Sequence, residues 1–271
     1  MVMATSDTVF AGSIPDIYDR LLVPLIFEPY ARDLAKRVAA TTPRLVLETA
    51  AGTGAVTRAL AASLTDARIV ATDLNQPMLD RAKARQSGNT RIEWKQADAL
   101  ALPFEDRTFD AVACQFGAMF FPDKVQGYRE ALRVLKPGGR FFFNVWDRIE
   151  DSEFADVVIQ SLASFFPKDP PRFLARTPHG YHDKNRIREE LKAAGFGAVS
   201  IEPVDARSKS SSARDVAVAF CQGTPLRSEI EARGAPSLED ATQHAAKALT
   251  ERFGEKAIDG RMRAIVVTAA R

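Results

Sequence analysis

The chain has 271 residues, of which 46% are hydrophobic and 27% charged, as in an ordinary globular protein. Its 37 Lys and Arg residues nearly balance 35 Asp and Glu, so the formal charge is only +2. That balance gives no general electrostatic footprint for nucleic acid or for an anionic membrane. We therefore expect neither as a partner.

Two further patterns that the sequence lacks bear on where in the cell the protein is expected. No stretch approaches the ~20 apolar residues of a membrane span, and the first fifteen residues lack the pattern of a signal peptide. Cys114 and Cys221 have no metal-type spacing, so we expect two free, buried thiols and no metal. These features predict a cytoplasmic protein, and they indicate no particular oligomeric state.

Short apolar runs alternate with helical patterns from Arg44 to Trp146, which is typical of parallel βαβ units. The strands expected in this half cover residues 45–47, 68–72, 92–97, 111–115 and 140–145. Apolar residues at helical spacing predict a helix after each of the first, second and fourth strands. The turn Lys136-Pro137-Gly138-Gly139 is expected to end the last of these helices.

The second half is less regular. It predicts a helix over 154–166, a Pro-rich bend, a helix over 187–194, a strand over 199–204, a loop over 208–212, a helix over 241–253 and a last strand over 264–268.

The first strand leads into a segment of small residues. Residues 48–54 read Glu-Thr-Ala-Ala-Gly-Thr-Gly. Such residues let a backbone approach a ligand closely, and the next helix points its first amides toward it. A tight strand-to-helix turn explains this segment equally well when it is taken alone. Asp73 favours a nucleotide site, because a carboxylate ending the second strand can accept both hydroxyls of a ribose.

Two positions in the sequence, 57 and 48, indicate which type of cofactor the site binds. A dinucleotide fingerprint needs glycine at position 57, where this chain has Thr57. An acid at Glu48 would face a pyrophosphate, whereas S-adenosylmethionine has no phosphate and carries two cationic groups. Three alternatives stay open: a non-catalytic module that binds S-adenosylmethionine, an NAD(P)-linked oxidoreductase, and a nucleic-acid methyltransferase. Against the nucleic-acid methyltransferase, the chain lacks the Pro-Pro-Tyr motif that is usual after the fourth strand of those enzymes. Gln115-Phe116-Gly117-Ala118 stands there instead.

In these motifs the chain resembles the class I S-adenosylmethionine-dependent methyltransferases, especially those similar to the ubiquinone and menaquinone C-methyltransferases. The matching pieces are Val46-Leu47-Glu48 with Ala50, Gly52 and Gly54; Thr72-Asp73-Leu74-Asn75 with Met78-Leu79; Ala97-Asp98-Ala99 with Leu102-Pro103-Phe104; Phe109-Asp110; Cys114-Gln115-Phe116 with Phe120-Phe121-Pro122-Asp123; and Arg133 to Gly139. They follow the family's order and spacing over about residues 44–146. Ala50 departs from the glycine that is frequent in the family, which narrows the pocket slightly.

The resemblance implies a Rossmann-like, doubly wound α/β sheet of seven strands. The sheet is expected to be mainly parallel, with an antiparallel last strand beside the fifth and a helical cap. We expect a single methyltransferase domain over residues 1–271. Its core is expected at about 40–146, 186–205 and 261–271, and its cap or lid at about 1–39, 147–185 and 206–260.

The resemblance also implies a cofactor site. Glu48, Ala50, Gly52, Thr53 and Gly54 are expected near the methionine part, Asp73 on the ribose, Leu74 and Met78 beside adenine, Asp98 with Ala99 at the adenine amine, Gln115 beside the transferring methyl, and Tyr18 at the cofactor carboxylate. Simpler roles stay open for three of them. Asp98 fits a helix N-cap, Met78 fits plain core, and Tyr18 fits packing within a lid broken by Pro24 and Pro29.

The expected activity is transfer of a methyl group to a small apolar or aromatic molecule. This reaction is an in-line displacement, so alignment can suffice and a base is needed only if the acceptor loses a proton. His179 is our candidate base, with an exposed turn residue and a positioning role as alternatives. His182-Asp183 is expected to cap a helix and His244 to be solvated. Apolar side chains at Phe165, Phe166, Phe173 and Tyr181 fit either a pocket roof or core.

Overall fold

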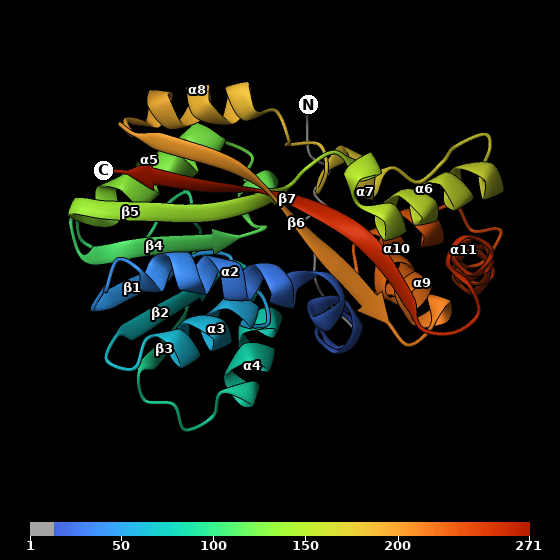
Figure 1. The fold of residues 1–271 in the computed structure, drawn as a ribbon, viewed down its shortest axis with the longest axis horizontal. Helices are drawn as coiled ribbons and strands as arrows, with labels where there is room; N and C mark the ends of the chain where they lie inside the picture. The colour runs from blue at the N-terminus through green and yellow to red at the C-terminus, as the bar shows by residue number, and fades with distance from the viewer. Residues whose placement is uncertain (1–13) are drawn as a thin grey trace. The chain divides into compact units, whose positions relative to one another are not determined.

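The computed structural model describes residues 14–271, so the first thirteen residues of the expected lid lie outside it. Its centre is a seven-stranded sheet of order β3-β2-β1-β4-β5-β7-β6 (Figure 1). The strands are β1 (Leu45–Glu48), β2 (Arg68–Asp73), β3 (Ile92–Gln96), β4 (Phe109–Gln115), β5 (Leu135–Trp146), β6 (Val199–Ser210) and β7 (Ile258–Ala270). The first five pair in parallel, and β7 runs antiparallel between β5 and β6. The predicted fold class is confirmed.

The chain divides into two compact units, which we call the sheet unit and the helical unit. The sheet unit comprises residues 30–145, 181–204 and 264–271, and the described helical unit comprises 14–29, 146–180 and 205–263. The sheet unit contains α2 (Glu28–Ala39) except for its first two residues. It also contains α3 (Ala55–Ser63), α4 (Gln76–Arg85), η3 (Ala118–Phe120), α5 (Lys124–Val134) and α8 (Lys184–Ala194). The helical unit holds α1 (Ile14–Ile17), η2 (Tyr18–Phe27), η4 (Ile149–Asp151), α6 (Glu153–Phe165), α7 (Phe173–Arg176), α9 (Ala213–Gln222), α10 (Leu226–Glu231) and α11 (Leu238–Phe253).

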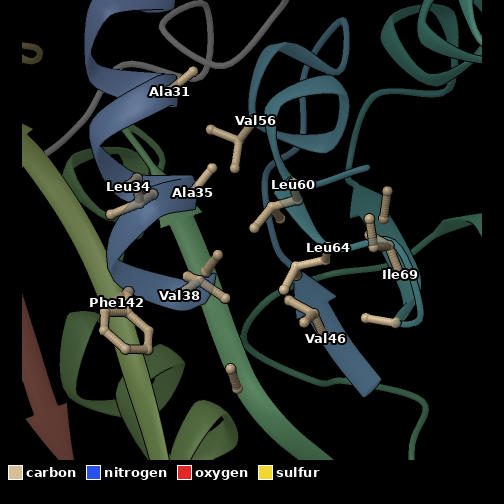
Figure 2. Close-up of a cluster of buried hydrophobic side chains, with 14 of the residues drawn as sticks. Ala31, Leu34, Ala35, Val38, Val46, Val56, Leu60, Leu64, Ile69 and Phe142 are labelled. Atoms are coloured by element: carbon tan, nitrogen blue, oxygen red, sulfur yellow. The ribbon is translucent and has the colours of Figure 1, made fainter. Parts of the chain in front are cut away.

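Three consecutive phenylalanines of β5 show how both faces of the sheet are covered. Phe142 belongs to an apolar cluster with residues of α2, α3 and the neighbouring strands (Figure 2). Phe141 and Phe143 instead contact Tyr128 of α5, with ring centroids 5.9 and 5.3 Å away. Because side chains alternate along a strand, α2 and α3 cover one face of the sheet and α5 covers the other.

The helical unit is built around α11, which packs against α9 and α6. Its N-terminus has a reciprocal capping box between Ser237 and Asp240. The ring of Phe154 on α6 meets that of Phe253 edge-on at 4.9 Å. None of the described helices is long and apolar enough to span a membrane.

Two expectations about local structure were wrong, and a third was right in part. Pro24 and Pro29 do not break the N-terminal segment, because Pro24 lies inside the π-helical η2 and Pro29 is the second residue of α2, where a helix needs no N–H donor. Ser208 to Ser210 continue β6 instead of forming a loop, and the Ser208 hydroxyl donates to the Leu25 carbonyl. Helix α5 ends at Val134, just before Lys136–Gly139 as predicted, but these four residues belong to β5, with a register irregularity against β4.

Candidate functional site

Polar side chains follow the apolar cluster on four adjacent strands of the sheet unit. Each lies two residues beyond a buried cluster member: Asp73 beyond Ala71, Glu48 beyond Val46, Gln115 beyond Ala113 and Asn144 beyond Phe142. Residues two apart on a strand share a face, so all four lie on the side covered by α2 and α3. Between β1 and β4 the strand order reverses, and ligands bind such switch points in doubly wound sheets.

Asp73 ends β2 and is only 7% exposed. Its Oδ2 accepts the Gly52 N–H at 2.8 Å, and its Oδ1 accepts the Asn75 N–H at 2.8 Å. Burial raises the pKa of this carboxyl, while the backbone N–H groups oppose the rise. The Asn75 side-chain amide also donates to Oδ1, at 3.4 Å. An ionised carboxylate offers about four acceptor positions, so a ligand hydroxyl can take a remaining position or replace this long bond.

Glu48 ends β1 and is almost completely buried. Its Oε2 accepts the hydroxyl of Thr57 at 2.6 Å. Burial raises the pKa of Glu48 to about 8, against the opposing effects of the Thr57 bond and the nearby Arg58 charge. A cation brought close to this carboxyl would favour its ionised form. Thr57, which stands where a dinucleotide site has glycine, therefore acts here as a partner of the acid.

The loop between β1 and α3 has an unusual backbone. Ala50, Gly52 and Gly54 all have positive φ, at 53°, 56° and 78°. A Cβ on Gly54 would lie 3.0 Å from the Trp94 ring, so this position requires glycine twice over. The hydroxyl of Thr53 is buried and has no hydrogen-bond partner among the described residues. A ligand oxygen or nitrogen at this loop would satisfy it.

The expected adenine contacts differ in exposure. Leu74 is 54% exposed and is the large hydrophobic side chain that the described part of the chain leaves open to solvent. Met78 is buried in α4, as expected of a core residue. Asp98 is exposed, and its Oδ1 accepts the Leu100 N–H at 2.9 Å. No helix begins there, so the alternative of a helix N-cap is wrong: Asp98 closes a turn, with the partly buried Ala99 inside it.

The two remaining candidates, Tyr18 and His179, belong to the helical unit. The Tyr18 ring stacks on Phe27 at 5.1 Å. His179 is not an exposed turn residue, since it is only 5% exposed, and its Nδ1 lies 2.8 Å from the Asp147 carbonyl. A carbonyl oxygen only accepts, so Nδ1 carries the proton and the lone pair of the neutral ring lies on Nε2.

The other singled-out residues have mainly structural surroundings. Asp183 caps α8 by accepting the Asn185 and Arg186 N–H groups, as predicted for the His182-Asp183 pair. His244 is half-buried, because it stacks on Phe165 at 4.4 Å. Phe166, Phe173 and Tyr181 are buried, as are both free cysteines.

Two residues beside the site were missed from the sequence. Asn144 is a fully buried amide, and Cys114 a fully buried thiol, on the adjacent strands β5 and β4. An asparagine inside the apolar run Phe141–Trp146 was a visible signal, because buried amides require partners. Its partner could not be inferred, since that depends on how β4 and β5 align.

Comparison with known proteins agrees with this geometry. A methyltransferase domain family matches residues 47–143. A demethylmenaquinone methyltransferase of Clavibacter sepedonicus is 34% identical over 173 residues, which cover 60% of this chain and 70% of the relative. A ubiquinone/menaquinone biosynthesis C-methyltransferase of Bartonella tribocorum is 38% identical over 57% of this chain and 65% of its own length, just under two thirds.

Solved structures show the same fold at low identity. A candidate methyltransferase of Bacillus halodurans has a TM-score of 0.57 and 23% identity, over 89% of this chain and 97% of its own. The cyclase SpnF has a TM-score of 0.60 and 19% identity, over 99% and 97%.

Sheet order, acidic strand ends and the matched family together define a Rossmann-like methyltransferase whose cofactor is S-adenosylmethionine. The chain belongs to the class I S-adenosylmethionine-dependent methyltransferases. Within that class it is related to the demethylmenaquinone and ubiquinone/menaquinone C-methyltransferases.

Proposed function

We propose that this enzyme transfers a methyl group to a small, apolar or aromatic molecule in the cytoplasm. The observation that carries the proposal is the buried Asp73 carboxylate, which ends β2. It accepts the backbone N–H of Gly52 in the loop between β1 and α3, which we call the cofactor loop. A carboxylate in this position can accept the hydroxyls of an adenosine ribose. The neighbouring loop would then bind a cofactor that has no phosphate.

The residues present fit the whole cofactor. Asp73 would accept the ribose hydroxyls, and exposed Leu74 would cover the adenine, with Met78 behind it and Asp98 and Ala99 at the adenine amine. Glu48 would balance the cationic end, while Ala50, Gly52, Thr53 and Gly54 would follow the methionine part. Tyr18 would contact the cofactor carboxylate, and Gln115 would lie beside the transferring methyl.

The bound cofactor would supply a methyl carbon already activated by a sulfonium. The chain's own contribution would then be alignment of the acceptor and exclusion of water. We propose that the sheet unit carries the cofactor. His179 would act as a base through Nε2 when the acceptor must lose a proton.

The relatives suggest which acceptors to test first. Their names describe a demethylmenaquinone methyltransferase and a C-methyltransferase of ubiquinone/menaquinone biosynthesis, so aromatic quinols with an unsubstituted ring position are the leading class. Such molecules agree with an apolar or aromatic substrate.

The test is formation of S-adenosylhomocysteine from S-adenosylmethionine, with and without a panel of quinols, phenols and small amines. We expect turnover that depends on one acceptor class and a methylated product detected by mass spectrometry. Tight binding of S-adenosylhomocysteine without turnover of any acceptor would instead favour a non-catalytic binding module.

A further inference from the structure

The loop directly after Gln115 is held in a strained conformation. Phe116 has a φ of +51°, in the left-handed region that side chains other than glycine rarely adopt. Such a conformation persists only when its surroundings hold it. Two buried side chains of this sheet, Asn144 and Cys114, lie against the backbone of Phe116, Gly117 and Ala118.

Asn144 binds the first of these amides. The Phe116 N–H donates to both the Asn144 side-chain Oδ1, at 3.0 Å, and the Asn144 carbonyl, at 3.1 Å. Asn144 is fully buried and lies level with Gln115 across the β4–β5 pairing. Its amide oxygen therefore fixes the chain at the position where Gln115 leaves the strand.

Cys114 lies against the other two residues. The Gly117 and Ala118 N–H groups and the Thr49 side chain in the cofactor loop are within hydrogen-bonding reach of its buried Sγ. A Cβ on Gly117 would lie 2.9 Å from this sulfur and 2.4 Å from the Ala50 Cβ. The two loops at the switch point are thus joined through one thiol and packed against each other without room for a further methyl group.

We infer that Cys114 and Asn144 are positioning residues, which hold the loop over residues 116–118 and thereby fix Gln115 for methyl transfer. This inference rests on the proposed function, since it assigns Gln115 to the methyl side of the site. Neither residue touches substrate in this role: each acts through the backbone that carries Gln115.

The kinetic test uses two variants of Cys114. Cys114→Ala removes the thiol, and Cys114→Ser replaces it with a hydroxyl. We expect Cys114→Ala to lower kcat about tenfold, because small misplacements are costly in an aligned displacement. KM for S-adenosylmethionine and affinity for S-adenosylhomocysteine should stay near the wild-type values, and Cys114→Ser should recover much of kcat. Asn144→Ala should give the same split.

Cys221→Ala is the matched control, because it removes the other buried thiol, which lies in the helical unit. It should leave kcat unchanged. Wild-type kcat in the Cys114→Ala, Asn144→Ala double variant would overturn the inference. A parallel loss of kcat, cofactor affinity and unfolding free energy would also overturn it, because that pattern belongs to a purely structural role.

A second measurement separates this inference from the proposed function. Hydrogen exchange of the peptide covering 115–121 can be measured without a methyl-accepting substrate. Exchange should become at least about tenfold faster in the double variant if the two side chains hold the loop. Unchanged exchange would refute the positioning role even in an active enzyme. Faster exchange in the double variant, together with a wild type that methylates none of the molecules tested, would leave the loop assignment standing and remove the proposed function.

Discussion

At the scale of single residues, the proposed ribose-binding role of Asp73 can be tested directly. Replacing it with alanine removes a buried carboxylate whose charge-assisted bonds would each contribute about 1.5–3 kcal/mol to binding. We therefore expect Asp73→Ala to weaken S-adenosylhomocysteine binding at least about tenfold in calorimetry. Asp80→Ala, which removes an exposed carboxylate on α4, is the control and should bind normally. An affinity within about threefold of wild type would exclude the ribose role of Asp73.

Glu48 gives a pH-dependent prediction. Its pKa of about 8 in the folded chain lies above the ordinary value of 4.5, so the unfolded chain loses this proton first as pH rises. Its contribution to stability is therefore complete below about pH 4.5 and lost as pH rises through about 8, with a slope of about 1.4 kcal/mol per pH unit between them. Urea unfolding of wild type and Glu48→Gln between about pH 5 and 8 measures it. Equal slopes in the two proteins would show that Glu48 ionises normally.

His179 can be tested as a base by a substitution that keeps its hydrogen bond. In His179→Asn the side-chain amide can still donate to the Asp147 carbonyl, but the lone pair of Nε2 is lost. A base predicts that His179→Asn and His179→Ala lower kcat equally and abolish its dependence on an ionising group. Recovery of kcat in His179→Asn would mean positioning, and His244→Ala should behave as wild type.

At the scale of elements, α8 illustrates a boundary that follows from local chemistry. Asp183 accepts two N–H groups of its first turn, and Gly195 ends it with a φ of +102°. We expect Asp183→Ala to lower the free energy of unfolding by about 0.5–2 kcal/mol, with affinity for S-adenosylhomocysteine unchanged. Asp183→Ser should restore most of the loss in chemical denaturation. A similar loss in His182→Ala would show that the segment is stabilised by packing instead of capping.

The elements that could be predicted are those with local signals. The first four strands were expected within two residues at each end, because short segments with apolar residues mark them and an acid lies at or just after the end of the first three. Strands β5, β6 and β7 extend well past the expected limits, since their outer residues pair only through contacts distant in sequence. The same reason hides Asn144 and Cys114: their roles depend on register between strands, which no single segment contains. Burial of His179 likewise comes from tertiary packing around an irregular segment.

At the scale of the whole molecule, cofactor choice should appear as ligand-linked stability. A ligand that binds only the folded chain stabilises it by about 2.7 kcal/mol at a hundredfold excess over Kd. S-adenosylhomocysteine should therefore raise Tm in a concentration-dependent manner, whereas NAD at the same concentration should not, because Thr57 and Glu48 occupy the dinucleotide positions. A larger shift with NAD would contradict the assignment of the cofactor. Asp73→Ala should abolish the shift while retaining a cooperative transition.

The place of β7 between β5 and β6 has a consequence for biosynthesis. A ribosome releases β6 before residues 211–257 and the strand with which β6 pairs have been made. At about 5–20 residues per second this delay lasts on the order of several seconds. Until then β6 lacks the strand with which it pairs, and an unpaired strand edge can pair with another chain. Residues that discourage such pairing lie within β6: Pro203 near its middle, with Glu202, Asp205, Arg207 and Lys209 around it.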